Sequence, residues 1–248
     1  MSDIPRLSGL IFVGVLGCHV GPVLLAATDP DNKQDEGGST PTKCHEGMVW
    51  VPAGMRPRLN GLVSRDSGAA ACAGTDAVEL AAFCLDINEV SVAEYARCVA
   101  VGRCPALACA ATTDRVDVSV TCTTWAGAEA YCAWRGVRVP TRDEWLREAT
   151  NGDDRLFPWG GDSAVLDLCT GRDDAQGPCV TRRLTGDVSA HGVRDMAANA
   201  SEWASPGACM GDSWSHTNGS PRIQRYALAC GVSSSPPSEC GIRCAANP

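Results

Sequence analysis

Residues 124–150 read TWAGAEAYCAWRGVRVPTRDEWLREAT, and this stretch carries two helix-capping signals in succession. The pattern predicts one helix over Trp125–Arg135 and a second over Arg142–Thr150. Each segment follows a threonine, whose hydroxyl can accept a hydrogen bond from a free backbone N–H of the first turn. Thr141 and Glu144 also have the spacing of a capping box, in which each side chain bonds the backbone of the other residue.

Two short strands and one more helix are predicted upstream of this stretch. The strand over Met48–Pro52 ends at a proline, and Phe83–Ile87 alternates in the manner of a strand. Ser91 and Glu94 repeat the capping-box spacing, so a helix is expected over Val92–Val101. Downstream of the quoted stretch, the sequence predicts loops and short strands without a further helix.

The composition divides the chain into three parts. Residues 46–248 carry the apolar patterning and are expected to form one domain, because neither an internal repeat nor a second hydrophobic pattern is present. Residues 19–45 are expected to form a flexible tether. Within it, Thr28–Lys43 has no large apolar residue, and such a segment cannot offset the entropy lost on ordering. Residues 1–18 are predicted to be a signal peptide.

The predicted signal peptide begins with a positive charge and ends at a cysteine. Arg6 precedes an apolar stretch over Leu7–Gly17, which has signal-peptide length. The sequence VLGC at 15–18 resembles a bacterial lipobox, in which Cys18 would be lipidated after cleavage. An ordinary signal peptide, cleaved near Ala26 with Cys18 discarded, is the alternative.

Cysteine is far more frequent than in cytosolic proteins. The chain has 15 cysteines spread along its length, which indicates a disulfide framework formed in an oxidising compartment. The odd number leaves one cysteine over, and lipidation of Cys18 would account for it. We therefore expect a protein of the bacterial cell envelope, lipid-anchored or secreted, in the periplasm or at the cell surface.

The charge balance excludes one class of partner. The net charge is −8 and the sequence has no basic run, whereas a nucleic-acid-binding face needs clustered lysine and arginine. No apolar run reaches the roughly 18 residues that a membrane span needs. We therefore expect no nucleic-acid partner, and contact with a membrane only through a lipid anchor at Cys18.

Seven segments of the chain, taken in order, resemble the sulfatase-modifying-factor family, whose members are also called formylglycine-generating-enzyme-like. The segments are 48–54, 83–95, 125–145, 157–160, 192–203, 211–214 and 241–244. The resemblance implies the family's fold, an irregular, loop-rich and disulfide-rich α/β (α+β) architecture related to C-type lectins.

The active members of the family oxidise a sulfatase cysteine to formylglycine with oxygen, and the resemblance implies a site of two cysteines that bind Cu(I). Thiolates suit this ion because Cu(I) is soft. The resemblance places the cysteines just after Gly211–Trp214, where this chain has no cysteine before Cys230. His216 lies about where the first thiol is expected, and Ser213 matches a serine that the family uses beside its thiols. We therefore expect no copper site, and we assign no catalytic residue.

An alternative hypothesis is that the protein retains the family's oxidase activity through a different pair of cysteines. Cys209 and Cys230 flank the same segment, and loops could bring them together as a redox pair. In that case the protein would be a formylglycine-generating oxidoreductase or a related oxygen-dependent oxidase. The plainer interpretation places both cysteines in structural disulfides.

Calcium is the cofactor that the resemblance favours. The family binds it with a segment that corresponds to residues 195–202, through two side chains and two backbone carbonyls. Here Asp195 and Glu202 keep the side-chain oxygens, and Ala198 and Ala200 would contribute carbonyls. Calcium takes six to eight oxygen ligands, which a tight loop with a carboxylate at each end can supply in part. A second family site would draw on residues 167, 168 and 174.

The resemblance also implies one disulfide, Cys132–Cys244. Local pairs such as Cys169–Cys179 and Cys230–Cys240 are plausible from their short separations, but the connectivity of the other cysteines cannot be read from sequence. Together these features favour a lipoprotein whose domain is a calcium-stabilised binding or structural module without the copper thiols. Its partner would be a protein or a glycan; a spacer without any ligand is the third hypothesis.

Overall fold

The computed structural model describes residues 44–57, 76–109, 114–153, 155, 157–160, 168–172, 176–183, 185–215 and 237–248. The predicted signal peptide with Cys18, and the predicted tether up to residue 43, lie outside the described residues. In these residues, short strands and three short α-helices are joined by long loops. The predicted α/β, loop-rich class is confirmed.

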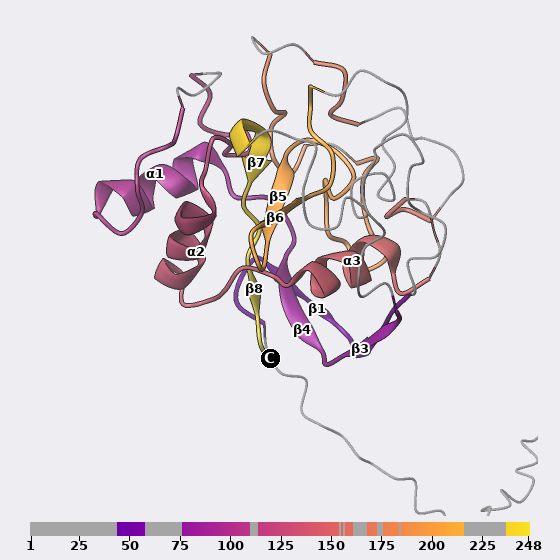
Figure 1. Ribbon diagram of the computed structural model, residues 1–248. Coiled ribbons are helices and arrows are strands. Elements are labelled where there is room, and N and C mark those ends of the chain that lie inside the picture. Colours follow the sequence, from indigo (N-terminus) through magenta and orange to yellow (C-terminus); the bar gives the residue numbers. More distant parts are fainter. Residues whose placement is uncertain are drawn as a thin grey trace, which may run out of the picture. The chain divides into compact units, whose positions relative to one another are not determined.

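The first sheet has three antiparallel strands in the order β1, β4, β8 (Figure 1). Their bounds are Met48–Val51, Phe83–Asp86 and Ala245–Ala246. Strand β4 lies in the middle, and all four of its residues are buried. Phe83 and Leu85 face one apolar cluster while Cys84 faces the other. The strand was predicted correctly, but its alternation does not mark a solvent-exposed face, because both faces of β4 are covered.

The three predicted helices are present, and their bounds agree with prediction to within one residue. They are α1 (Val92–Ala100), α2 (Trp125–Trp134) and α3 (Arg142–Thr150). Both capping boxes form: the hydroxyls of Ser91 and Thr141 accept from backbone N–H groups, and Glu94 and Glu144 accept in return. In the described part of the chain, no helix has the length and hydropathy that a membrane span requires.

Two further sheets complete the described architecture. Strands β2 (Gly54–Arg56) and β3 (Val78–Leu80) form an antiparallel pair. In the other sheet, β5 (Ser201–Ala204) pairs antiparallel with β6 (Ala208–Met210) and parallel with β7 (Cys240–Gly241). A 3₁₀ turn over Pro237–Glu239 leads directly into β7.

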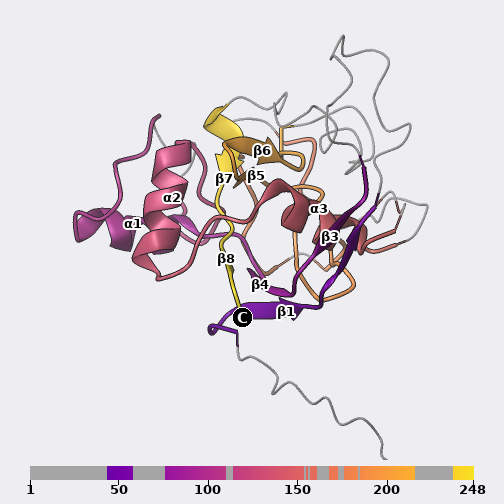
Figure 2. The same ribbon diagram turned by 60° about the horizontal axis from the view of Figure 1, so that its bottom comes forward.

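Apolar side chains gather in two clusters on either side of the strands. Figures 1 and 2 both place α1 and α2 side by side to one side of β8, with α3 on the other side. Tyr95, Ala128 and Ile242 belong to the cluster beneath α1 and α2, whereas Trp145 and Met210 belong to the cluster beneath α3. The strands therefore separate two cores. Helices α1 and α2 cover one core, and α3 covers the other.

Among the described residues, six disulfides tie the loops to these cores. They are Cys44–Cys84, Cys98–Cys104, Cys109–Cys122, Cys132–Cys244, Cys169–Cys179 and Cys209–Cys240. The pair implied by the family resemblance, Cys132–Cys244, and the local pair Cys169–Cys179 are both present. The suggested pair Cys230–Cys240 is wrong, because Cys240 is bonded to Cys209. Cys18, Cys72 and Cys230 lie outside the described residues.

The Cys132–Cys244 bond closes the longest loop among these disulfides, with a sequence separation of 112 residues. The chain-entropy model assigns such a loop about 5 kcal/mol, against about 2 kcal/mol for a loop of six residues. We expect the double variant Cys132→Ala/Cys244→Ala to lose more stability in urea-induced unfolding than Cys98→Ala/Cys104→Ala, whose separation is 6. Equal losses in the two variants would contradict this account.

Candidate functional site

The segment Gly211–Ser215, which directly precedes the positions where the resemblance places the family's thiols, follows β6 and contains oxygen groups. The Ser213 hydroxyl donates to Glu239 at 2.5 Å, and the Ser215 hydroxyl donates to the other oxygen of that carboxylate at 2.8 Å. The two hydroxyl oxygens lie 3.1 Å apart. Ser213 is fully buried. We call Ser213, Ser215 and Glu239 the hydroxyl–carboxylate cluster.

Backbone geometry fixes the position of this cluster. Gly211 has a φ of +82°, and a Cβ there would lie 3.0 Å from the carbonyl oxygen of Met196. A side chain at position 211 would therefore be strained and crowded. The Ser213 N–H donates to the Asp212 carboxylate at 2.8 Å, which orients the turn that presents the serine.

The disulfide Cys209–Cys240 lies beside the cluster and joins the two strands that flank β5. Its cysteines are 4 % and 1 % exposed, so reagents in solution do not reach the sulfurs readily. The hypothesis that Cys209 forms a redox pair with Cys230 is wrong, because Cys209 is already bonded to Cys240. His216 and Cys230 lie outside the described residues.

The donor atoms of the described site do not fit Cu(I). A soft ion of this kind needs thiolate or thioether ligands. All 12 cysteines within the described ranges are in disulfides, and a disulfide sulfur is not a thiolate. The hydroxyl–carboxylate cluster offers only hard oxygen atoms. We therefore derive no copper chemistry from this site.

The predicted calcium segment lies nearby and is buried. Asp195 is 3 % exposed, and Ala198, Ala200 and Glu202 are each 1 % exposed. Asp195 adopts a left-handed conformation with φ +60°, which produces the tight turn that the sequence suggested. In the part of the chain that the structure describes, three or more His, Cys, Asp or Glu side chains are nowhere arranged to hold a metal ion.

Arg243 binds the carboxylate of Glu202. Its Nε lies 2.9 and 3.0 Å from the two Glu202 oxygens, and its Nη2 lies 2.5 Å from one of them. The Trp145 indole N–H donates to the same carboxylate at 2.6 Å. The remaining Arg243 donors reach the carbonyl oxygens of Asp86 and Arg194. The sequence did not suggest this pairing, because Glu202 and Arg243 are 41 residues apart.

Four buried carboxyl groups surround this one guanidinium: Glu89, Asp187, Asp195 and Glu202. Burial, reinforced by the charges of Asp195 and Glu202, raises the pKa of Asp187 to about 8 and that of Glu89 well above its usual value. Burial lowers the pKa of Arg243, but the Glu202 carboxylate outweighs this and raises it overall. Within the described residues, these carboxyl groups thus repel one another while they are attracted to Arg243.

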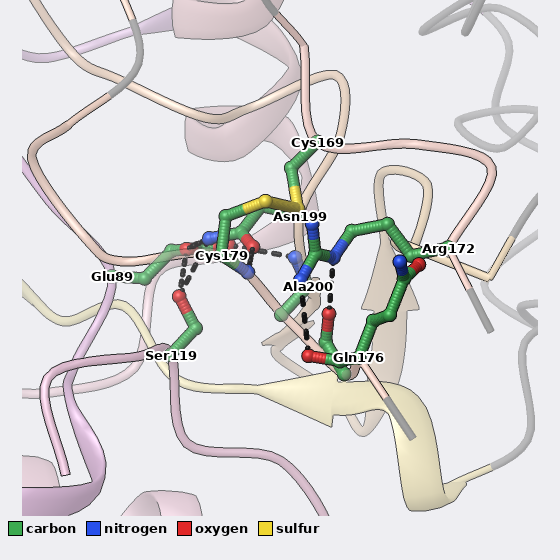
Figure 3. The surroundings of a disulfide bond; sticks show 9 residues. Glu89, Ser119, Cys169, Arg172, Gln176, Cys179, Asn199 and Ala200 are labelled. Carbon is green, nitrogen blue, oxygen red and sulfur yellow. Dashed lines mark hydrogen bonds between the residues drawn. A yellow bond between two sulfur atoms is a disulfide. The ribbon is translucent and has the colours of Figure 1, made fainter. Parts of the chain in front are cut away.

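Asn199 organises the loops at one edge of this acidic cluster (Figure 3). Its amide nitrogen donates to Glu89 and to the Ser119 hydroxyl, and its amide oxygen accepts from the Cys179 N–H at 2.8 Å. The Ala200 N–H donates to Glu89 at 2.9 Å. Through these bonds the Cys169–Cys179 loop is held against Glu89.

Sequence reasoning gave Asn199 no role of its own within the segment 195–202. It is 1 % exposed, and its side chain is used entirely in the internal hydrogen bonds just described. The sequence did hold one indication that Asn199 is buried, namely its position among Ala197, Ala198 and Ala200. A polar residue in a buried apolar run needs a hydrogen-bond partner inside the protein. Asp187 was missed as well, because nothing in its local sequence indicates burial.

Comparison with known proteins supports the resemblance that the sequence suggested. The family model described as "Sulfatase-modifying factor enzyme 1-like domain" matches residues 33–248. The chain belongs to this family. Curated relatives include a hercynine oxygenase from Mycolicibacterium smegmatis, 34 % identical over 36 % of this chain and 22 % of that protein. The chain thus spans about a fifth of the length of that relative.

Two other relatives carry different names. A formylglycine-generating enzyme from Thermomonospora curvata is 27 % identical over 55 % of this chain and 58 % of that protein. A bovine protein named inactive C-alpha-formylglycine-generating enzyme 2 is 42 % identical over 19 % of this chain and 16 % of its own length. Relatives therefore include proteins named as enzymes and proteins named as inactive.

Solved structures share the fold of this family member at low identity. PvdO from Pseudomonas aeruginosa has a TM-score of 0.54 and 16 % identity, and covers 81 % of this chain and 94 % of that one. CarF has a TM-score of 0.52 and 18 % identity, covering 81 % and 98 %. At such identities the likeness concerns the fold alone.

Proposed function

We propose that this sulfatase-modifying-factor-like domain is a binding or structural module that does not oxidise sulfatase cysteines. The observation that carries the proposal is the hydroxyl–carboxylate cluster directly before the positions where the resemblance places the thiols, positions at which this sequence has no cysteine. Cys209, the nearest described cysteine in sequence, is occupied in a bond to Cys240. A partner, either a protein or a glycan, would then be recognised by the fixed loops of the scaffold.

The proposal includes a cell-envelope location and a lipid anchor. The six disulfides support folding in an oxidising compartment. The lipobox-like sequence that ends at Cys18 supports anchoring to a bacterial membrane. Metabolic labelling with a clickable fatty acid tests the anchor. A labelled protein that becomes unlabelled on Cys18→Ser supports lipidation, and an unlabelled wild-type protein would refute it.

The alternative, a formylglycine-generating oxidoreductase, draws support from the relative in Thermomonospora curvata. The two functions differ in Cu(I) binding and in peptide oxidation. We expect this protein, after mild reduction, to take no Cu(I) from a colorimetric chelator. We also expect no oxygen-dependent formylglycine formation in a cysteine peptide copied from a sulfatase, whereas the Thermomonospora enzyme serves as the positive control.

A matched variant identifies the source of any copper that binds. In Cys209→Ala/Cys240→Ala, the thiols that reduction could release beside Ser213 are removed. Stoichiometric Cu(I) binding by the wild-type protein together with formylglycine formation would overturn the binding-module proposal. If the double variant then lost that binding, the reduced disulfide would be the copper site.

Calcium is the cofactor that we propose for the segment with Asp195. The mutual repulsion of the buried carboxyl groups near Arg243 supports a cation there, since an added positive charge would relieve it. Asp195 would supply a side-chain oxygen, and the carbonyls of Ala198 and Ala200 would supply two more. Glu202 would then bind the ion while it remains paired with Arg243.

Calcium at 100 times its dissociation constant would stabilise the domain by about 2.7 kcal/mol, or about 5–10 °C in melting temperature. We expect this shift in thermal unfolding when calcium is added after treatment with EDTA. Asp195→Asn should lose the shift, and Asp117→Asn, an exposed aspartate paired with Arg115, should keep it. An unchanged melting temperature at millimolar calcium would refute the calcium site.

A further inference from the structure

A pocket of about 630 Å³ lies beside the acidic cluster, which contributes Glu89 to its lining. It is bordered by the residues before β1, the end of β4, helix α1, the end of α2 and the loop at Arg182. The hydroxyl–carboxylate cluster contributes no residue to its lining. The exposed side chains of Glu46, Arg97 and Arg182 stand at its margin, so the pocket opens to solvent. Its volume is in the range of small-molecule sites.

The floor of the pocket is an ion pair whose charged groups are already hydrogen-bonded within the protein. Arg135 donates to both oxygens of Asp86, at 2.6 and 3.0 Å, and the Cys244 N–H donates to the same carboxylate at 2.9 Å. The guanidinium carbon lies 6.0 Å from the centre of the Tyr131 ring. This floor is rigid and carries no net charge, so the ligand preference depends on the remaining groups.

Three of the remaining groups have no partner among the described residues. The Asn88 amide oxygen is buried and lacks a hydrogen bond, so it requires a donor. Glu46 and Arg97 line the pocket and form neither a hydrogen bond nor an ion pair through their side chains in the described structure. The pocket therefore presents an acceptor, a carboxylate and a guanidinium that can each bind a ligand.

A second guanidinium is held at the margin by a strained backbone. Arg182 has a φ of +72°, a conformation that costs energy for a residue with a side chain. Its Nη2 lies 3.4 Å from Glu94, whose other oxygen closes the capping box of α1. Arg97 follows Glu94 by three residues in α1, so it lies on the same helix face. Two guanidinium groups thus flank Glu94.

We propose that this pocket binds a free α-amino acid. The carboxylate of the ligand would pair with Arg97 and Arg182, and its ammonium group would donate to the Asn88 oxygen and to Glu46. A simple anion would leave the Asn88 oxygen without a donor and would face the charge of Glu46. A simple cation would face two guanidinium groups. A zwitterion satisfies both sets of groups within one molecule.

The first experiment screens the twenty proteinogenic amino acids at 10 mM by thermal shift on the purified domain. We expect at least one to raise the melting temperature. The best binder is then compared, by titration calorimetry, with its N-acetyl form and its amide, which each lack one charge. We expect each blocked form to bind at least ten-fold more weakly. Equal binding of either form would overturn the proposal, as would the absence of any shift in the screen.

Variants assign the binding to this pocket. Arg97→Ala and Glu46→Gln should each weaken binding at least ten-fold, because each removes the partner of one ligand charge. Asn88→Leu should do the same by removing the acceptor. Arg103→Ala is the matched control, since Arg103 is an exposed arginine just beyond α1 that does not line the pocket. Unaltered affinity in Arg97→Ala and Glu46→Gln would show that the amino acid binds elsewhere and would overturn the assignment.

This inference does not rest on the proposed function, and the two can fail separately. The residues proposed for calcium, Asp195 and Glu202, and the cysteine pair tested for copper, Cys209 and Cys240, do not line the pocket. Calorimetry of the amino acid is therefore carried out in EDTA, so that a failure of the calcium site cannot be mistaken for a failure of the pocket.

Discussion

Arg243→Met is expected to lower the free energy of unfolding by about 3–5 kcal/mol, the usual cost of removing one partner of a buried ion pair. Arg243 is fully buried, and it is the cation that faces Glu202 together with three further carboxyl groups. Without it, Glu202 would be left buried among other carboxyl groups and without its cation. Urea-induced unfolding, with the disulfides intact, measures the change.

Two companion variants separate charge burial from simple loss of contacts. Arg138→Met removes a partly exposed pair with Glu144, whose N–O distance is 2.6 Å, and should cost only about 0–1 kcal/mol. Arg243→Met/Glu202→Gln removes both charges and should recover part of the loss. If Arg243→Met were no more destabilising than Arg138→Met, the acidic cluster would not depend on its arginine.

Stability is expected to fall as the pH rises from about 4 to about 8, because of Asp187. Its pKa is raised to about 8 in the folded protein by burial and then by the charge of Asp195, against an ordinary value of 3.8. In this window the unfolded chain releases the proton while the folded protein retains it. The unfolded state is thereby favoured, and each unit of pKa difference is worth about 1.4 kcal/mol.

Asp187→Asn tests this assignment. The amide oxygen can still accept the hydrogen bond that the Ala197 N–H donates at 2.6 Å, but the side chain no longer titrates. In EDTA, the variant should lose less stability than the wild-type protein between pH 5 and pH 8. Glu89, whose pKa is also raised by burial, is expected to contribute to the remaining slope. Parallel curves for the two proteins would exclude Asp187 as the source.

The elements predicted well from sequence are those with local signals. The capping boxes at Ser91 and Thr141 fixed the starts of α1 and α3, because cap and helix lie within four residues. Strands β7 and β8 have two residues each and are defined only by their pairing with β5 and β4. Such pairing depends on distant parts of the chain, so local patterning could not indicate it.

The same distinction applies to the candidate site. The sequence located the segments that carry Ser213 and Asp195, because each stands in a recognisable motif. It did not give the partner of either segment: Glu239 follows Ser213 by 26 residues, and Arg243 follows Glu202 by 41. Nor could it give the Cys209–Cys240 bond, since spacing does not determine disulfide connectivity. Partners of buried polar groups become visible only in the folded structure.

Strands β4 and β5 pair with strands supplied by residues 240–246, and this has a consequence for how the protein folds during synthesis. Residues 240–246 supply β7 and β8, the cysteines that bond to Cys209 and Cys132, and the arginine that binds Glu202. A nascent chain that has emerged only as far as residue 236 lacks all of these. It lacks the strands that pair with β4 and β5, the cysteines that bond to Cys132 and Cys209, and the cation that binds Glu202. Folding of the domain must therefore wait for its last strands, and oxidation before that point would favour wrong cysteine pairs.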